Sequence, residues 1–129
     1  SEGNVFISVK DEDKSQLKTL CTKLKGLGFK FIATKGTGLK MKEDGFEVKI
    51  INKVMEGRPH IVDAILNNEV SMVINTTEGR QSIKDSYSIR RSALEHSVFL
   101  TTTISGGFAI VESLEQGEKV WSYDALQNS

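Results

Sequence analysis

The chain of 129 residues contains little of several residue types, since it has one cysteine, one proline and two histidines. The single cysteine, Cys21, cannot form an internal disulfide, and one cysteine with two histidines gives no metal-ligand spacing. The longest apolar runs extend for only a few residues, so no segment is expected to cross a membrane. These absences exclude a disulfide scaffold, a zinc module and a membrane protein, and they predict a cytoplasmic protein in a reducing compartment.

The chain also lacks net charge, because 17 basic residues balance 17 acidic ones. The charges are nevertheless uneven: residues 1–60 hold 12 Lys and Arg against 8 Asp and Glu, and residues 61–129 hold 5 against 9. A mildly basic first half suits a small anionic ligand. It is too weak and too interspersed with acids to predict a nucleic-acid groove, so neither nucleic acid nor membrane is expected as a partner.

Short apolar runs alternate with helical patterns along the whole chain, without a repeat or a linker. The predicted strands are residues 4–9, 29–33, 46–51, 70–74 and 98–101. The first predicted helix begins after residues 11–13. The other predicted helices cover residues 39–43, 60–67, 81–95 and 104–114. Strands that alternate with helices favour an α/β fold, an open five-stranded parallel sheet with helices on both faces. We expect one domain over residues 1–129, with a polar C-terminal tail from residue 115.

Within these predicted helices, two local signals are specific. Cys21 falls on the apolar stripe of the first helix, which predicts a buried thiol. Pro59 suits the first position of the helix over residues 60–67.

Two polar segments, Thr34–Gly38 and Asn75–Arg80, each follow a predicted strand and are interpreted as turns. Glycine permits positive φ, so backbone N–H groups can converge on one point, and Thr34, Lys35, Gly36 and Thr37 add hydroxyl and ammonium donors around it. Asn75, Thr76 and Thr77 stand at the end of a buried strand, where their polar atoms need partners. Because ligands of such sheets bind beyond the carboxyl ends of the strands, both segments predict a phosphate pocket there. Plain structural turns and helix caps are the alternatives.

Other polar residues fall where they can reach the same crevice. Ser8 ends the first predicted strand, Lys14 opens the first helix, and Lys53 follows the third strand. The Asn75 amide can read a base or ribose, and Asp85 can accept hydrogen bonds from ribose hydroxyls. Solvated surface positions are the alternative for each lysine and for Asp85.

Catalytic patterns are not evident in the sequence. His60 and His96 have no partner pattern, and Glu56 and Asp63 are not clearly paired for acid–base work. The Arg90–Arg91 pair can bind phosphate or dock another domain, which leaves a pure docking module as an alternative.

Several strings in order resemble the C-terminal allosteric domain of the large subunit of bacterial carbamoyl phosphate synthetase. They cover the chain from Val5 to about Leu114, and they are Ile7-Ser8-Val9 with Lys14, Ala33-Thr34-Lys35-Gly36-Thr37, residues 52–60, Val73–Thr77, Asp85-Ser86 with residues 89–94, and Thr102-Thr103 with residues 106–109. The resemblance implies a methylglyoxal-synthase-like fold and regulation by nucleoside monophosphates, with UMP inhibiting and IMP favouring activity or assembly.

Position by position, the resemblance assigns the nucleotide pocket to Lys14, Thr34, Thr37, Lys53, Asn75 and Thr77. It ties Ser8 to effector sensitivity and Thr102 to an ornithine response. Lys35 departs from the His often found there, which puts the relative preference for UMP and IMP in doubt. The parent is expected to be a glutamine-hydrolysing, ATP-dependent ligase that uses Mg or Mn, and this part is expected to hold no cofactor. Its expected partners are the synthetase domains and a glutaminase small subunit, in arginine and pyrimidine biosynthesis.

Two enzyme families share parts of this pattern. Methylglyoxal synthase needs a carboxylate in a Gly-Gly-Asp turn, but this chain has Arg58 there, and its second essential Asp falls at about Thr76. The cyclohydrolase domain of purine synthesis is similar in residues 34–37 but not in residues 75–80 or 89–94. A phosphate-binding lyase therefore remains an alternative to the regulatory domain.

Overall fold

The chain folds around one sheet of five parallel strands, in the order β3–β2–β1–β4–β5. The structure is a computed structural model that describes residues 3–76 and 79–117, apart from the side chains of residues 55 and 79–86. The strands are β1 (Asn4–Ser8), β2 (Lys30–Thr34), β3 (Lys49–Ile51), β4 (Met72–Asn75) and β5 (Phe99–Thr101). The predicted open parallel sheet is confirmed.

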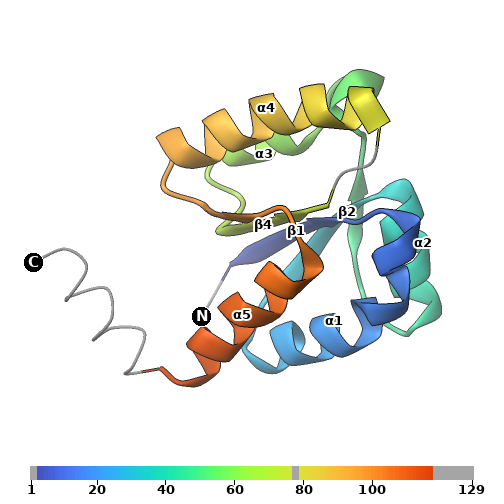
Figure 1. Cartoon of the computed structure of the whole chain (residues 1–129), viewed down its shortest axis with the longest axis vertical. Helices are drawn as coiled ribbons and strands as arrows, with labels where there is room; N and C mark the ends of the chain where they lie inside the picture. Colours follow the sequence, from blue (N-terminus) through green and yellow to red (C-terminus); the bar gives the residue numbers. More distant parts are fainter. Residues whose placement is uncertain (1–2, 77–78, 118–129) are drawn as a thin grey trace, which may run out of the picture.

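Helices connect the strands and cover both faces of the sheet (Figure 1). The α-helices are α1 (Leu17–Gly26), α2 (Lys35–Glu43), α3 (Ile61–Leu66), α4 (Gly79–Glu95) and α5 (Ile104–Glu115). Two short 3₁₀ helices, η1 (Asp11–Gln16) and η2 (Val54–Glu56), follow β1 and β3. None of the helices in the described ranges is both long and apolar enough to cross a bilayer.

The alternation of β1 divides the interior into two apolar cores. Val5 and Ile7 pack with α1, α2 and α5 on one face, while Phe6 packs with α3 and α4 on the other. All three side chains are at most 1% exposed. A strand segment covered on both faces needs apolar residues at successive positions, which explains the apolar runs Val5–Ile7 in β1 and Met72–Ile74 in β4.

The order in which strands are added to the sheet reverses between β1 and β4. The first strands extend outward from β1 through β2 to β3, and the chain then returns to place β4 on the other side of β1. Ser8 and Asn75 are register partners at the carboxyl ends of these two strands. The topological switch point, where parallel sheets bind ligands, therefore lies beside residues that the sequence analysis selected.

The interpretation of residues 34–38 as a turn was wrong. Helix α2 begins at Lys35, and neither Gly36 nor Gly38 has a positive φ. Gly38 has a different requirement, since a Cβ at this position would lie 2.8 Å from Cγ1 of Ile50 on β3. The glycine therefore permits close approach of α2 to the sheet rather than a turn.

Several element boundaries also differ from the prediction by a few residues. The third strand spans only Lys49–Ile51; Phe46 precedes it, with its N–H donating to the Met41 carbonyl of α2 at 3.0 Å and its ring packed edge-on against Phe31 at a centroid distance of 5.8 Å. Pro59 precedes α3 instead of opening it, since His60 is the N-cap and Ile61 the first helical residue. Helix α4 begins two residues before the predicted start at residue 81.

Candidate functional site

A cavity of about 320 Å³ opens at the carboxyl ends of β1, β2 and β4. Its polar lining comes from the ends of these strands, η1, the first turn of α2 and the segment after β3. Its apolar lining comes from β1 and the residue after it, from η2, and from α3 and α4. The residues are Phe6, Ser8, Val9, Lys10, Asp11, Lys14, Thr34, Gly36, Thr37, Asn52, Lys53, Val54, Ile61, Asn75, Thr76 and Ile89.

Hydroxyl groups tie the strand ends together at the floor of the cavity. Thr34 and Thr37 are 4% and 2% exposed, and the hydroxyls of Ser8 and Thr34 share a hydrogen bond of 2.8 Å. The Thr37 hydroxyl accepts from the backbone N–H of Val9 at 3.0 Å. These bonds hold the start of α2 against the end of β1, so the floor is organised without a ligand.

The first turn of α2 supplies the positive end of a helix dipole to this cavity. Thr34 is the N-cap but makes no capping hydrogen bond, and Gly36 and Thr37 of the first turn line the cavity. The first N–H groups of a helix have no partner within the helix, and they attract anions. An anion seated here is stabilised by backbone groups that need no rearrangement.

Two lysines face the same space. A Cβ at Gly36 would lie 3.3 Å from the Lys14 ammonium, which places that charge beside the start of α2. Lys53 lines the cavity from the other side, after β3. The helix terminus and the two ammonium groups together make an electropositive site for one small anion.

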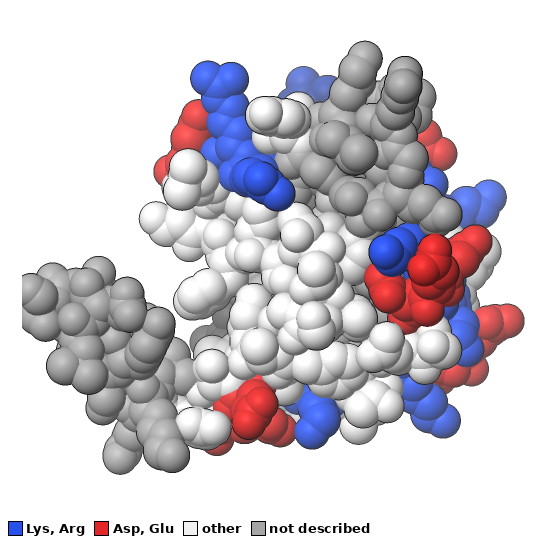
Figure 2. Space-filling view, viewed as in Figure 1, with Lys and Arg blue, Asp and Glu red and all other residues white. Residues whose placement is uncertain are grey.

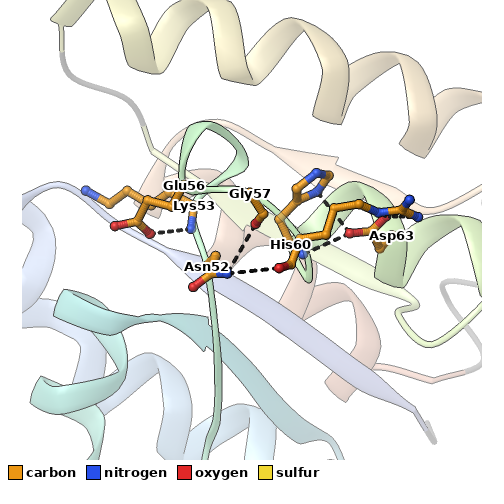
Figure 3. A network of polar contacts seen from close by, with 7 residues as sticks. Asn52, Lys53, Glu56, Gly57, His60 and Asp63 are labelled. Carbon is orange, nitrogen blue, oxygen red and sulfur yellow. Dashed lines mark hydrogen bonds and ion pairs between the residues drawn. The ribbon is translucent and has the colours of Figure 1, made fainter.

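Lys53 lies on a loop whose base is closed by several hydrogen bonds (Figure 3). The Asn52 side chain donates to the carbonyl oxygens of Gly57 and Arg58 at 3.2 and 3.4 Å, and the Lys53 N–H donates to the Glu56 carboxylate at 2.7 Å. Figure 3 shows the Lys53 side chain extending away from the rest of this network. The loop therefore positions its cation without using that cation for its own bonds.

Asp63 anchors the other end of this loop. Its carboxylate accepts from the Arg58 guanidinium at 2.7 Å and from the His60 N–H at 3.0 Å. The hydrogen bond from Arg58, followed by that from His60, lowers the pKa of Asp63. Glu56 and Asp63 are thus held by loop contacts, and neither lines the cavity.

The end of β4 is bonded to the segment that follows β1. The Thr76 hydroxyl accepts from the Lys10 N–H at 2.8 Å, and the Thr76 N–H donates to the Ser8 carbonyl at 2.9 Å. Asn75 is 8% exposed and also lines the cavity. The polar end of β4 is therefore part of the same organised rim.

The structure brings most of the predicted site residues together. Eight of them line the cavity: Ser8, Lys14, Thr34, Gly36, Thr37, Lys53, Asn75 and Thr76. Lys35 does not, because it is the exposed first residue of α2. Thr102 is half-buried after β5 and is not among the cavity residues. Thr77 lies outside the described residues, as does the side chain of Asp85.

Several residues of the lining were not predicted from the sequence. Asp11 was not selected as a site residue, although its spacing of three residues from Lys14 indicates a pair. Asn52 gave no separate signal. The apolar wall of Phe6, Ile61 and Ile89 reads as ordinary core in the sequence, since only the packing shows that these side chains border a cavity.

Cys21 takes no part in the site. It is fully buried in α1 as a free thiol, as predicted. Burial, with a smaller contribution from the charge of Asp44, raises its pKa to about 12. The thiol is therefore protonated and inert near neutral pH.

Sheet order and site together define a parallel α/β domain with a cavity lined by lysine and hydroxyl side chains at its switch point. A protein-family model described as the MGS-like domain matches residues 16–102. The chain belongs to the MGS-like domain family.

The curated relatives of this chain are much longer proteins. The chain is 56% identical over 115 residues to the carbamoyl phosphate synthase large chain of Pseudomonas putida, which covers 89% of this chain and 11% of that protein. It is 48% identical over 126 residues to the large chain of Xanthomonas axonopodis pv. citri, covering 96% and 12%. The chain thus spans about a tenth of the length of these relatives.

Solved structures show the same fold at low sequence identity. Methylglyoxal synthase from Elizabethkingia anophelis superposes with a TM-score of 0.67 at 19% identity, covering 85% of this chain and 77% of that one. The structure of ForH gives a TM-score of 0.66 at 19% identity, covering 89% and 79%. The predicted methylglyoxal-synthase-like fold is confirmed.

Proposed function

We propose that this chain is a regulatory domain that binds nucleoside monophosphates, UMP and IMP, in the cavity at the carboxyl edge of the sheet. One observation carries the proposal: the start of α2, Lys14 and Lys53 line the same cavity, and the Lys14 ammonium borders Gly36 in the first turn of α2. A phosphate monoester dianion matches that combination of backbone amides and two cations.

The remainder of the cavity supports a nucleoside rather than free phosphate. Phe6, Ile61 and Ile89 form an apolar wall, and Asn75 offers an amide at the rim. A base can lie against apolar side chains while an amide distinguishes its polar edge. The volume of about 320 Å³ is at the lower end of the range for small-molecule sites.

The relatives support a place for this domain within a carbamoyl phosphate synthetase. In that setting the effector signal would pass to the synthetase domains of the same chain and to the glutaminase small subunit. Thr102 would contribute to an ornithine response from its separate position after β5. ATP and Mg or Mn would belong to the parent enzyme, which serves arginine and pyrimidine synthesis.

Lys53→Ala tests the phosphate end of the site. Deleting one cation that contacts the phosphate should weaken the binding of UMP and of IMP by about tenfold or more. A hydrogen bond to a charged group contributes about 1.5–3 kcal/mol. Calorimetric titration into the purified domain measures both affinities.

Wild-type protein at a hundredfold excess of UMP over Kd should gain about 2.7 kcal/mol of stability, and uridine should give far less.

Lys49→Ala is the matched control, because Lys49 lies on β3 outside the cavity and pairs with Glu69 at 3.8 Å. Its UMP affinity should equal that of the wild type. The proposal would be wrong if millimolar UMP and IMP neither titrate nor raise the melting temperature of the wild-type domain.

A further inference from the structure

An acidic side chain stands in the wall of this electropositive cavity. Asp11, the first residue of η1, lines the cavity together with Lys14, and its carboxylate Oδ1 lies 2.5 Å from the Lys14 ammonium. The hydrogen bond and the charge of Lys14 lower the pKa of Asp11, with a smaller contribution from Lys53. A permanent negative charge is therefore held within the field of both cations.

The two members of this pair differ in their freedom to move. The Asp11 side chain is 87% exposed, whereas that of Lys14 is 25% exposed and borders Gly36 at the start of α2. Because the Asp11 side chain is already mostly exposed, its rotation away from Lys14 gives up little burial. Movement of the Lys14 ammonium would remove its charge from the start of α2. An incoming anion can therefore displace Asp11 and keep Lys14.

Charged side chains of both signs lie side by side over this part of the surface (Figure 2). They occupy the edge where η1 follows β1 in Figure 1. A purely attractive anion site would present lysines without acids. Asp11 in the cavity wall reduces the positive potential that a bound dianion would experience, and it pairs with one of the two lysines, Lys14.

We propose that Asp11 is an internal counter-ion that competes with the ligand's anionic group for Lys14 and thereby sets the affinity of the cavity. This inference rests on the proposed function and names a residue that tunes it. In the empty cavity Asp11 neutralises Lys14. Binding replaces this single carboxylate by a dianion that also contacts the first turn of α2.

Asp11→Asn tests the inference, because it removes the competing charge while preserving the size of the side chain. The expected result is a three- to tenfold tighter binding of UMP and of inorganic phosphate in calorimetric titrations at about 50 mM salt. The gap between variant and wild type should shrink at about 500 mM salt, where the Debye length is only a few ångströms. A merely structural role for Asp11 would not produce that salt dependence.

Glu12→Gln is the matched control. Glu12 is the exposed neighbour of Asp11, and it does not line the cavity. Its substitution changes the net charge of the protein by the same amount. It should change UMP affinity by less than about twofold at 50 mM salt.

The double variant Asp11→Asn/Lys14→Ala separates competition from general repulsion. If Asp11 acts by occupying Lys14, its substitution should tighten binding far less when Lys14 is already absent. Binding of UMP by Asp11→Asn that equals or falls below that of wild type would overturn the inference. Equal gains with and without Lys14 would overturn it as well. Failure of the wild-type domain to bind UMP would instead refute the proposed function, and this inference with it.

Discussion

Gly36 and Gly38 lie two positions apart in α2 but answer different physical requirements. Gly36 faces the cavity, where a Cβ would lie 3.3 Å from the Lys14 ammonium. Gly38 faces the sheet, where a Cβ would lie 2.8 Å from Cγ1 of Ile50. The first contact is with the mobile end of a side chain, whereas the second is with a branch close to the backbone of β3. Gly36 therefore matters for the cavity, and Gly38 matters for the packing of α2 on the sheet.

Alanine at each position should therefore change a different measured quantity. Gly38→Ala should lower the free energy of unfolding by about 1–2 kcal/mol, since overpacking exceeds the gain of about 1 kcal/mol in helix propensity. Gly36→Ala should keep or raise stability but weaken UMP a few-fold, because Lys14 must move. Urea denaturation and calorimetric titration on both variants measure this. A loss of stability in Gly36→Ala with none in Gly38→Ala would contradict the packing of α2.

At the scale of elements, the segment between β3 and α3 is organised by polar contacts more than by apolar burial. The Asn52 N–H donates to the Pro59 carbonyl at 3.1 Å, so the two ends of the segment are bridged. Gly57 has a φ of 98°, a conformation that side chains other than glycine rarely adopt. Asp63 then ties Arg58 and His60 to the start of α3. The position of Lys53 depends on this framework.

The lowered pKa of Asp63 makes this segment sensitive to acid. A carboxyl group whose pKa is lower in the folded state stabilises that state above its ordinary value of 3.8. That stabilisation is lost as the pH falls through the lower folded value. Wild-type protein should therefore exceed Asp63→Asn in stability at pH 7, and the difference should vanish towards pH 2. Thermal melts of both proteins across this range measure it, and a difference independent of pH would contradict the role of the charge.

At the scale of the whole molecule, the fold is shared with methylglyoxal synthase, so the described lining of the cavity can be compared with the needs of an enzyme. Among the described residues that line the cavity, the only carboxylate is Asp11, whose lowered pKa makes it a weak proton acceptor. Arg58, which the resemblance aligns with the carboxylate turn of methylglyoxal synthase, is bonded to Asp63 and does not line the cavity. The proposed regulatory role therefore predicts that phosphate compounds bind without being converted.

Incubation with dihydroxyacetone phosphate should therefore yield no methylglyoxal above the uncatalysed background, although the phosphate group should still compete with UMP. A colorimetric assay for methylglyoxal and a competition titration measure the two effects. A methylglyoxal synthase assayed in parallel is the positive control. Turnover that increases with the concentration of this protein would favour the lyase alternative.

Most of the architecture was predictable because it depends on local patterns. Continuous apolar runs such as residues 70–74 indicate strands buried on both faces, and the spacing of Leu17, Leu20 and Leu24 indicates a helix. Boundaries were less predictable. Whether Thr34–Gly38 turns or begins a helix depends on the packing of Gly38 against Ile50, which no local pattern contains.

Residue types alone indicated donors for an anion at the strand ends, because threonine hydroxyls, backbone N–H groups and a lysine ammonium occur together there. Their meeting in one cavity required the sheet order, which sets the end of β1 between β2 and β4. Only the folded chain shows that the Asp11–Lys14 pair borders the cavity and that Lys35 is not part of its lining. Spacing along a sequence determines which groups share an element, whereas distances between elements arise from packing.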